Sequence, residues 1–436
     1  MQLTPEKLEQ HWLPFTNNRE FKREPRLFVG ASGMYYWSQH GHKILDGSSG
    51  LFTTPAGHCR PEIAEAVSAQ LHTLDFTPSF MRGHPGAFEL ANAVAALTPP
   101  GLKHIFFCNS GSEAVDTAIK IAFAFHLARK EAERTYLVSR ERAYHGVNMG
   151  GTALSGIVKN REAFGAVMPG VLHLRHTLLA ENRMTRGMGA SGVELADDLL
   201  RFVQLVGERR IAAVFVEPIA GSTGVLVPPR GYLQRIREIC DRYGILLVFD
   251  EVICGFGRTG EPFAADSFGV TPDLITMAKA LTNGAQPMGA VAVRDSVYRT
   301  IIDRAPDGAT EFFHGYTYSA HPAACAAGLA TLKIYETEQL FAKGRELSPY
   351  FQDAMFGLQE LPVVADVRGY GLLAGVEIKA GSAPGVRGTQ LQAKLFDRGL
   401  HVKTTGDVAI LAPAFIATRA EIDQMTAILR DALSEY

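Results

Sequence analysis

Two charged side chains of opposite sign stand directly at the ends of apolar runs. Asp250 ends ILLVFD at 245–250, and Lys279 follows LITMA at 274–278. Runs without polar alternation are typical of strands buried in a parallel sheet, and ligands bind outside the carboxyl ends of such strands. A desolvated lysine there can form a Schiff base, and a carboxylate can pair with a pyridine nitrogen. Together these two residues indicate pyridoxal phosphate chemistry, although each alone also fits an ordinary solvent-facing side chain.

A phosphate needs an anion site, and CNSGSEA at 108–114 offers one. The pattern predicts a strand, a Ser-Gly-Ser turn and a helix that opens at Ser112 or Glu113. Backbone N–H groups and the helix dipole favour an anion at such a terminus. The motif AYHG at 143–146 offers an aromatic face for a ring. A serine N-cap and a buried tyrosine are the ordinary alternatives, so it is the combination at strand ends that indicates the cofactor.

The stretch FDEVICGFGRTG at 249–260 contains G-x-G-x-x-G and an acidic strand end, two features of nucleotide-binding proteins. A dinucleotide fingerprint requires that the last glycine open a helix, but Glu261-Pro262 follows it here. A nucleotide hydrolase requires a loop that ends in Gly-Lys-Ser/Thr, and the sequence has no Gly-Lys pair. We therefore expect the glycines to form a mobile or tightly turned loop.

Short apolar runs alternate with longer amphipathic ones from about Lys103 onward, which predicts an α/β domain with crossover helices. The expected strands are 104–109, 211–218, 245–250, 273–279 and 289–294, and the expected helices are 112–130 and 231–244. After about Glu311 the pattern changes to helices near 321–337 and 344–358, a strand within 371–379 and a last helix from Arg419. Strand-like pieces at 27–37 and 42–47 complete a smaller α+β domain drawn from both chain ends. The stretches 183–192 and 380–388 are expected to be surface loops.

Composition points to an ordinary globular protein. The 436 residues are 47% hydrophobic and 20% charged, with a net charge of -2, so nothing favours nucleic acid or a membrane surface as partner. The five cysteines form no CxxC pair, which is typical of reduced thiols, and no signal peptide or membrane-length run is present. We expect a cytoplasmic protein that binds no metal.

The sequence resembles the class III, or ω-amino acid, aminotransferases of PLP fold type I over nearly its whole length. The motifs that carry the resemblance are NSGSEAVDTAIK, AYHGVN, VEPIAGSTGV, LLVFDEVICGFGRTG, MAKALTNGAQPMGA and HGYTYSAHP. The resemblance implies a large domain with a mostly parallel seven-stranded sheet and helices on both faces. It also implies boundaries: 1–50 and 311–436 form the small domain, and 51–310 form the large domain that binds pyridoxal 5′-phosphate.

The resemblance also implies a role for each motif residue. Lys279 would form the Schiff base and move the proton, and Asp250 would pair with the pyridine nitrogen. Val252 and Tyr144 would cover opposite ring faces. The remaining cofactor contacts would be Gly111 and Ser112 at the phosphate, Glu217 near the ring's 3-hydroxyl, and Thr317 at the phosphate of the neighbouring subunit, which implies an obligate homodimer or a dimer of dimers.

Three positions depart from the pattern that the resemblance implies. Lys403 stands where an arginine would bind the substrate carboxylate, Phe52 where a tryptophan is usual, and Arg82 where an uncharged residue is expected. Lysine keeps the charge but loses the planar two-pronged match to a carboxylate, and phenylalanine leaves a roomier wall. Either Arg82 has partly taken over anion recognition, or it is a surface or interface residue and Lys403 keeps the role.

The implied activity is transfer of an amino group from an ω-amino acid or amine, such as β-alanine, to pyruvate by a ping-pong mechanism. Alternatives with the same fold and cofactor are a different donor (taurine-like, polyamine or another amine), an aminomutase or a racemase. A non-catalytic protein that binds pyridoxal phosphate is a further alternative, which the presence of Lys279, Asp250 and the Ser-Gly-Ser turn disfavours.

Overall fold

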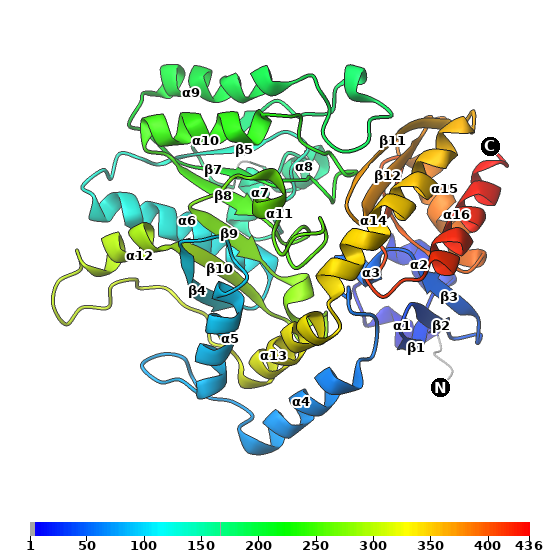
Figure 1. Ribbon diagram of the computed structural model, residues 1–436, viewed down its shortest axis with the longest axis horizontal. Coiled ribbons are helices and arrows are strands. Elements are labelled where there is room, and N and C mark those ends of the chain that lie inside the picture. Colours follow the sequence, from blue (N-terminus) through cyan, green and yellow to red (C-terminus); the bar gives the residue numbers. More distant parts are fainter. Residues whose placement is uncertain (1–4, 166) are drawn as a thin grey trace.

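The computed structural model describes residues 5–165 and 167–436, and its largest element is a seven-stranded sheet (Figure 1). Strand β10 is antiparallel to both of its neighbours, and all other neighbouring pairs are parallel. In sheet order the strands are β4 (Leu102–Cys108), β10 (Gly289–Arg294), β9 (Leu274–Met277), β8 (Leu246–Asp250), β7 (Ile211–Val216), β5 (Tyr136–Arg140) and β6 (Val171–Leu174). The expected mostly parallel sheet is confirmed.

Alternate side chains of the central strands enter two separate hydrophobic cores, one on each face of the sheet. In β8, Leu247 and Phe249 belong to one core, and Leu246 and Val248 belong to the other. Because strand side chains alternate between faces, a strand covered on both sides has apolar residues at every position. The helices that contribute to the two cores include α10 (Tyr232–Tyr243) in the first and α6 (Gly111–Ala128) in the second.

Further helices surround this sheet. They are α4 (Pro61–Thr73), α5 (Pro85–Ala95), α7 (Met149–Leu154), α8 (Val158–Phe164), α9 (Asp198–Val206), α11 (Ala264–Phe268), α12 (Asp295–Ile302) and α13 (Pro322–Thr337), with 3-10 turns η1 (Ala180–Asn182), η2 (Val193–Asp197) and η3 (Lys279–Thr282). The long helix α13 contacts both α4 and α5.

A smaller α+β part combines elements from both ends of the chain, and the helices α1, α2 and α16 lie together on the right-hand side of Figure 1. Strand β3 pairs in parallel with β13, so that Leu45 lies opposite Leu400. The two four-stranded sheets consist of β1 (Phe28–Ser32), β2 (Tyr35–Ser38), β3 (Lys43–Asp46) and β13 (Leu400–His401), and of β11 (Val364–Tyr370), β12 (Leu373–Ile378), β15 (Val408–Leu411) and β14 (Lys403–Thr405). The helices are α1 (Pro5–Glu9), α2 (Asn18–Arg23), α3 (Ser49–Phe52), α14 (Leu340–Phe356), η4 (Gly357–Glu360), α15 (Val386–Asp397) and α16 (Arg419–Leu433). The boundaries at residues 50 and 310 stay a prediction.

Helix α15 begins inside the stretch 380–388 that the sequence predicts to be a loop. Its first turn has no side-chain cap of its own, and Gly385 precedes it with φ 82°. Instead, the carboxylate of Asp407 accepts hydrogen bonds from the backbone N–H groups of Gly385 and Gly388, both at 2.9 Å. The cap comes from a residue 19 to 22 positions away, so no local pattern could reveal it.

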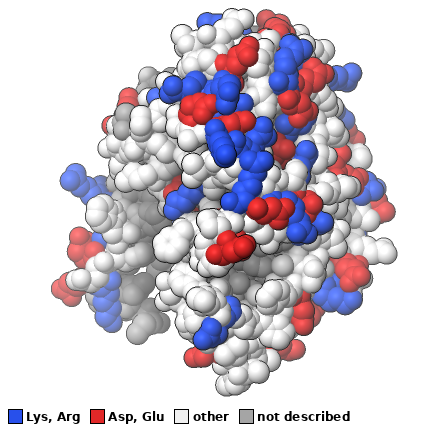
Figure 2. Space-filling view, turned by 90° about the vertical axis from the view of Figure 1, so that its left-hand side faces the viewer, with Lys and Arg blue, Asp and Glu red and all other residues white. Residues whose placement is uncertain are grey.

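Residues 5–165 and 167–436 contain neither a membrane-spanning helix nor a cluster of metal ligands. No helix in these ranges is long and apolar enough to cross a membrane. No three His, Cys, Asp or Glu side chains of the same ranges are grouped so that they could hold a metal ion. On the face drawn in Figure 2, Lys and Arg side chains are interspersed with Asp and Glu.

Candidate active site

A cavity of about 340 Å³ lies at the carboxyl ends of the large sheet's parallel strands. Strands β4, β5, β7, β8 and β9 all end at this edge, because β10 is antiparallel to both β4 and β9. The cavity lining includes seven residues that the sequence analysis singled out: Gly111, Ser112, Tyr144, Glu217, Asp250, Val252 and Lys279. Segments far apart in the chain, from Thr53 to Met288, thus meet in one cavity.

Lys279 lies two residues beyond the end of β9 and begins the turn η3. Its backbone has φ 45°, a left-handed conformation that is uncommon for a residue with a side chain. Removal from bulk water lowers the pKa of the Lys279 ammonium, while the negative charges of Asp250 and Glu217 oppose that shift. A lysine with a lowered pKa has a larger fraction of free amine, which is the nucleophilic and basic form.

Asp250 is the last residue of β8, and two hydrogen bonds fix its buried carboxylate. Oδ2 lies 2.7 Å from Nδ1 of His145, and Oδ1 accepts from the backbone N–H of Val252 at 3.2 Å. His145 is buried, and its Nε2 has no hydrogen-bond partner within the part of the chain that the structure describes. Sequence reasoning missed His145, although it directly follows Tyr144 in the motif AYHG. The pair holds the carboxylate in one orientation at the cavity wall.

A second buried carboxylate, Glu217, lies directly after β7. Its Oε1 accepts a hydrogen bond from the backbone N–H of Tyr144 at 2.9 Å. Burial, together with the nearby charge of Asp250, raises the pKa of Glu217 to about 7, although His145 acts in the opposite direction. Near neutral pH this group therefore exists in both protonation states and can accept or donate a hydrogen bond.

The amino-terminal end of helix α6 also faces the cavity. Ser110 is the N-cap, because its side chain accepts from the N–H of Glu113 at 3.1 Å, so the ordinary capping interpretation holds for this serine. Ser112 Oγ accepts from the N–H of Val147 at 3.0 Å. A Cβ on Gly111 would lie 3.0 Å from two methyl carbons of Val252. The missing side chain leaves the first N–H groups of the helix open to a ligand, as an anion site requires.

The sequence profile of the aminotransferase class-III family matches residues 17–433. The chain belongs to this family. As a class-III aminotransferase, it is an enzyme that depends on pyridoxal 5′-phosphate.

Among its relatives, an omega-aminotransferase from Caulobacter vibrioides is 52% identical, and 98% of each chain is covered. An omega-amino acid–pyruvate aminotransferase from Pseudomonas putida is 49% identical over 96% of this chain and 94% of the relative. Among solved structures, an (S)-enantioselective omega-transaminase from Thermomicrobium roseum has a TM-score of 0.92 at 36% identity, with 99% and 97% of the two chains covered. The omega transaminase from Pseudomonas jessenii in complex with PMP has a TM-score of 0.93 at 30% identity, with 100% and 98% covered.

The cavity of this aminotransferase fits pyridoxal phosphate by its donor set. It contains an amine with a lowered pKa at Lys279, a fixed carboxylate at Asp250 and an open helix terminus at Gly111. These are the chemical partners of an aldehyde, a ring nitrogen and a phosphate, respectively.

Of the residues proposed to contact substrate, Lys403 is bonded directly to a residue of the cavity lining. Its Nζ donates to the backbone oxygen of Ser222 at 3.2 Å and to Thr405 Oγ1 at 3.0 Å, and Ser222 itself lines the cavity. Burial lowers the pKa of the Lys403 ammonium to about 8, and the charge of Lys279 adds to this shift. Phe52 is buried in the hydrophobic core, and its neighbour Thr53 lines the cavity instead.

Arg82 and Thr317 lie outside the cavity of the single chain and are exposed. The two segments that carry them touch each other, since Ser79 Oγ donates to the carbonyl oxygen of Ser319 at 2.6 Å. Arg82 itself donates only to the neighbouring carbonyl of Met81 among the described residues. Within the single chain, the segment of Arg82 thus lies beside the segment of Thr317. Neither residue belongs to the cavity that contains the other predicted cofactor contacts.

Proposed function

We propose that this class-III aminotransferase moves the amino group of an ω-amino acid or amine to pyruvate. The observation that carries the proposal is one cavity that contains Lys279, Asp250 and the open amino terminus of α6. The relatives named above add the substrate class. A beta-alanine–pyruvate aminotransferase from Pseudomonas aeruginosa is also 48% identical over 98% of this chain and 96% of its own length.

When bound, pyridoxal phosphate supplies a ring that accepts electrons and a carbonyl carbon that exchanges amino groups. Asp250 would face the ring nitrogen, and its bond to His145 prevents the carboxylate from turning away. Gly111 and Ser112, which line the cavity at the helix terminus, would bind the phosphate, and Tyr144 and Val252 would contact the ring. Glu217 would lie near the ring's 3-hydroxyl group.

Lys279 moves the proton. Because its pKa is lowered, the free amine takes the proton from the substrate carbon that carries the amino group. The nearby negative charges of Asp250 and Glu217 then stabilise the ammonium that forms at Nζ, until it returns the proton. The keto acid passes through the same steps in reverse, which gives ping-pong kinetics.

Lys403 binds the carboxylate of the keto acid and of carboxylate-bearing donors. Both of its hydrogen-bond acceptors, Ser222 O and Thr405 Oγ1, are neutral, so the bonds leave its positive charge uncompensated. A partly buried cation of this kind is stabilised by an anionic ligand. The role of Arg82 in anion binding remains a prediction that requires a second subunit.

A second copy of the chain completes the site. The segments around Arg82 and Thr317 expose large apolar side chains, including Met81 (94% exposed) and Phe313 (96% exposed). Phe80 and Phe88 are exposed beside them. Contiguous apolar surface of this kind marks a protein interface, and a twofold dimer would bury it on both subunits. Thr317 would then contact the phosphate in the partner's cavity.

The visible spectrum of the purified protein tests this proposal. We expect a yellow protein whose band disappears with β-alanine and returns with pyruvate, because the two half-reactions convert the cofactor back and forth. A Lys279→Ala variant serves as control and should complete neither conversion at the wild-type rate. A yellow wild-type protein that ignores β-alanine and other ω-amino acids would contradict the substrate class, and a protein that stays colourless with added pyridoxal phosphate would contradict the whole proposal.

A further inference from the structure

The loop 255–260, GFGRTG, contacts the smaller part of the molecule so closely that two glycines are required. At Gly257, with φ 100°, a Cβ would lie 2.5 Å from Phe341 and 2.8 Å from Phe415. On the other side of the contact, a Cβ on Gly371 would lie 2.4 Å from the backbone oxygen of Arg258. All three distances are far below van der Waals contact, so the glycines allow the loop to dock against the turn between β11 and β12.

At the tip of this loop, the buried guanidinium of Arg258 joins three separate segments. Nη1 donates to the backbone oxygens of Leu372 at 3.1 Å and Pro413 at 2.6 Å, and Nη2 donates to Ser49 Oγ at 3.3 Å. The backbone oxygen of Arg258 also accepts from the N–H of Leu372 at 3.1 Å. The planar guanidinium reaches these acceptors from two nitrogens, whereas the three donors of a lysine ammonium lie on a single nitrogen.

The opposite end of the loop is equally fixed to the cavity. Glu251 directly follows Asp250, and its buried carboxylate accepts from the N–H groups of Ala264 and Ala265 at 2.6 and 2.8 Å. These two bonds tie the beginning of the loop to the start of α11. The segment that carries Asp250 therefore stays in place when Arg258 is displaced.

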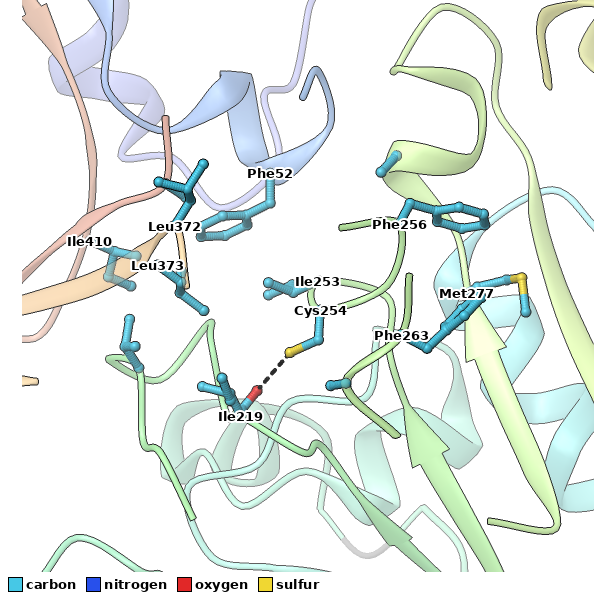
Figure 3. Close-up of a cluster of buried hydrophobic side chains, with 14 of the residues drawn as sticks. Phe52, Ile219, Ile253, Cys254, Phe256, Phe263, Met277, Leu372, Leu373 and Ile410 are labelled. Atoms are coloured by element: carbon cyan, nitrogen blue, oxygen red, sulfur yellow. Dashed lines mark hydrogen bonds between the residues drawn. The ribbon is translucent and has the colours of Figure 1, made fainter. Parts of the chain in front are cut away.

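Ser49, one of the three partners of Arg258, begins a strained segment that reaches the cavity. Ser49 has φ 46° and Phe52 has φ 63°, both in the left-handed region. The N–H of Thr53 donates to the Ser49 carbonyl at 2.8 Å, and Thr53 lines the cavity opposite Gly284. Figure 3 labels Phe52 and Leu372 within the same cluster of buried hydrophobic side chains, and the backbone oxygen of Leu372 accepts a bond from Arg258.

We propose that Arg258 is a positioning residue that fixes the Ser49–Thr53 wall of the cavity relative to the segment carrying Asp250 and Val252. It acts through Ser49, Leu372 and Pro413 and touches neither substrate nor cofactor. Without these bonds, the left-handed residues at 49 and 52 relax toward ordinary backbone conformations. Thr53 then moves with them, and the cavity loses its shape on the substrate side.

Two variants of Arg258 and one matched control test this inference, which rests on the proposed function only for its kinetic part. Arg258→Met removes the donors but keeps an unbranched side chain, and Arg258→Lys keeps a charge without the planar group. The control is Arg134→Met. Like Arg258, Arg134 is buried, lies outside the cavity lining and donates to two backbone oxygens, those of Ile211 and Tyr243. Unlike Arg258, it makes no bond to the segment Ser49–Thr53.

Hydrogen–deuterium exchange of the holoenzyme provides a readout that does not depend on turnover. Below the melting temperature of every variant, we expect Arg258→Met to speed exchange in peptides that span residues 47–56. Arg134→Met should lower the melting temperature without this local effect, and Arg258→Lys should give an intermediate result. Wild-type exchange at 47–56 in Arg258→Met would overturn the inference, whether or not the protein transaminates β-alanine.

Steady-state kinetics test whether the Ser49–Thr53 wall of the cavity contributes to substrate positioning. Because a misplaced wall weakens substrate positioning, we expect Arg258→Met to raise KM for both the amine and the keto acid by about tenfold. Its cofactor absorption band should stay at the wild-type position, since Lys279 and Asp250 are held by other bonds. The inference would also be overturned by KM values within twofold of wild type, or by an activity loss that only equals that of Arg134→Met.

Discussion

At the scale of single residues, Lys403 is the group whose charge most directly affects carboxylate substrates. Its Nζ bonds only to Ser222 O and Thr405 Oγ1 among the described residues, and burial brings its pKa to about 8. Lys279 lowers this pKa further, while Glu217 raises it. The side chain therefore loses its positive charge within the range of pH in which aminotransferases can be assayed.

We predict that KM for pyruvate rises about tenfold for each pH unit above 8, because the charged fraction of Lys403 falls in that proportion. Below this value the ammonium is charged and KM should be constant. The measurement is a pH profile of KM for pyruvate. The same profile for a donor amine that has no carboxylate is the comparison, because such an amine responds to the titration of Lys279 but not to that of Lys403. Lys403→Arg keeps its charge and should flatten the profile; identical profiles for the variant and wild type would speak against the role.

At the scale of an element, the amino terminus of helix α6 determines whether an anion can reach the backbone. Ser110 caps the helix, so the N–H groups near Gly111 and Ser112 are left for a ligand. Gly111 has no side chain there, and a Cβ would meet the methyl carbons of Val252. The helix thus offers the phosphate its dipole and its free donors together.

We predict that Gly111→Ala raises the dissociation constant for pyridoxal phosphate by about tenfold, or about 1.4 kcal/mol. The new methyl group forces Val252 toward the ring and shields the N–H groups. Alanine favours a helix over glycine by about 1 kcal/mol, so the helix itself is not weakened. Titration of the apoprotein, followed by the visible band, gives the constant. Gly30→Ala, which adds a Cβ with nothing within 4 Å, is the control and should bind like wild type.

At the scale of the whole molecule, the proposed dimer explains why two predicted site residues lie outside the cavity. Arg82 and Thr317 belong to touching segments with exposed apolar side chains such as Met81 and Phe313. A partner that covers this surface would receive Thr317 at its phosphate. Each subunit would then hold an incomplete site without the other.

Mixed dimers test this arrangement. Lys279→Ala destroys the site of its own chain, and Thr317→Asp repels the phosphate of the partner's site, so each homodimer should be inactive. When equal amounts are mixed and exchanged, half of the dimers are mixed, and each has one intact site. We therefore predict about a quarter of wild-type activity in the mixture. Activity that stays at zero despite subunit exchange, verified by mass spectrometry of differently tagged chains, would rule out the shared site.

The sequence by itself determined five strands of the large sheet and the chemistry at their ends, but it did not reveal β5 and β6. Periodicity is local, so an apolar run such as 245–250 predicts a covered strand, and the residue at its end must lie at the sheet's ligand-binding edge. Asp250, Lys279 and the Ser-Gly-Ser turn were accessible in this way, and the resemblance of their motifs supplied the family.

Only the tertiary structure decided which side chains are partners. The contact of His145 with Asp250, the cap that Asp407 gives α15, and the bonds of Arg258 to Ser49 and Pro413 all join residues far apart in the chain. Phe52 is buried in the core and has a left-handed backbone, neither of which a single sequence could show, and its place at the substrate wall stays a prediction. Such pairings depend on how packed elements meet in space, and a single sequence contains no periodic signal for them.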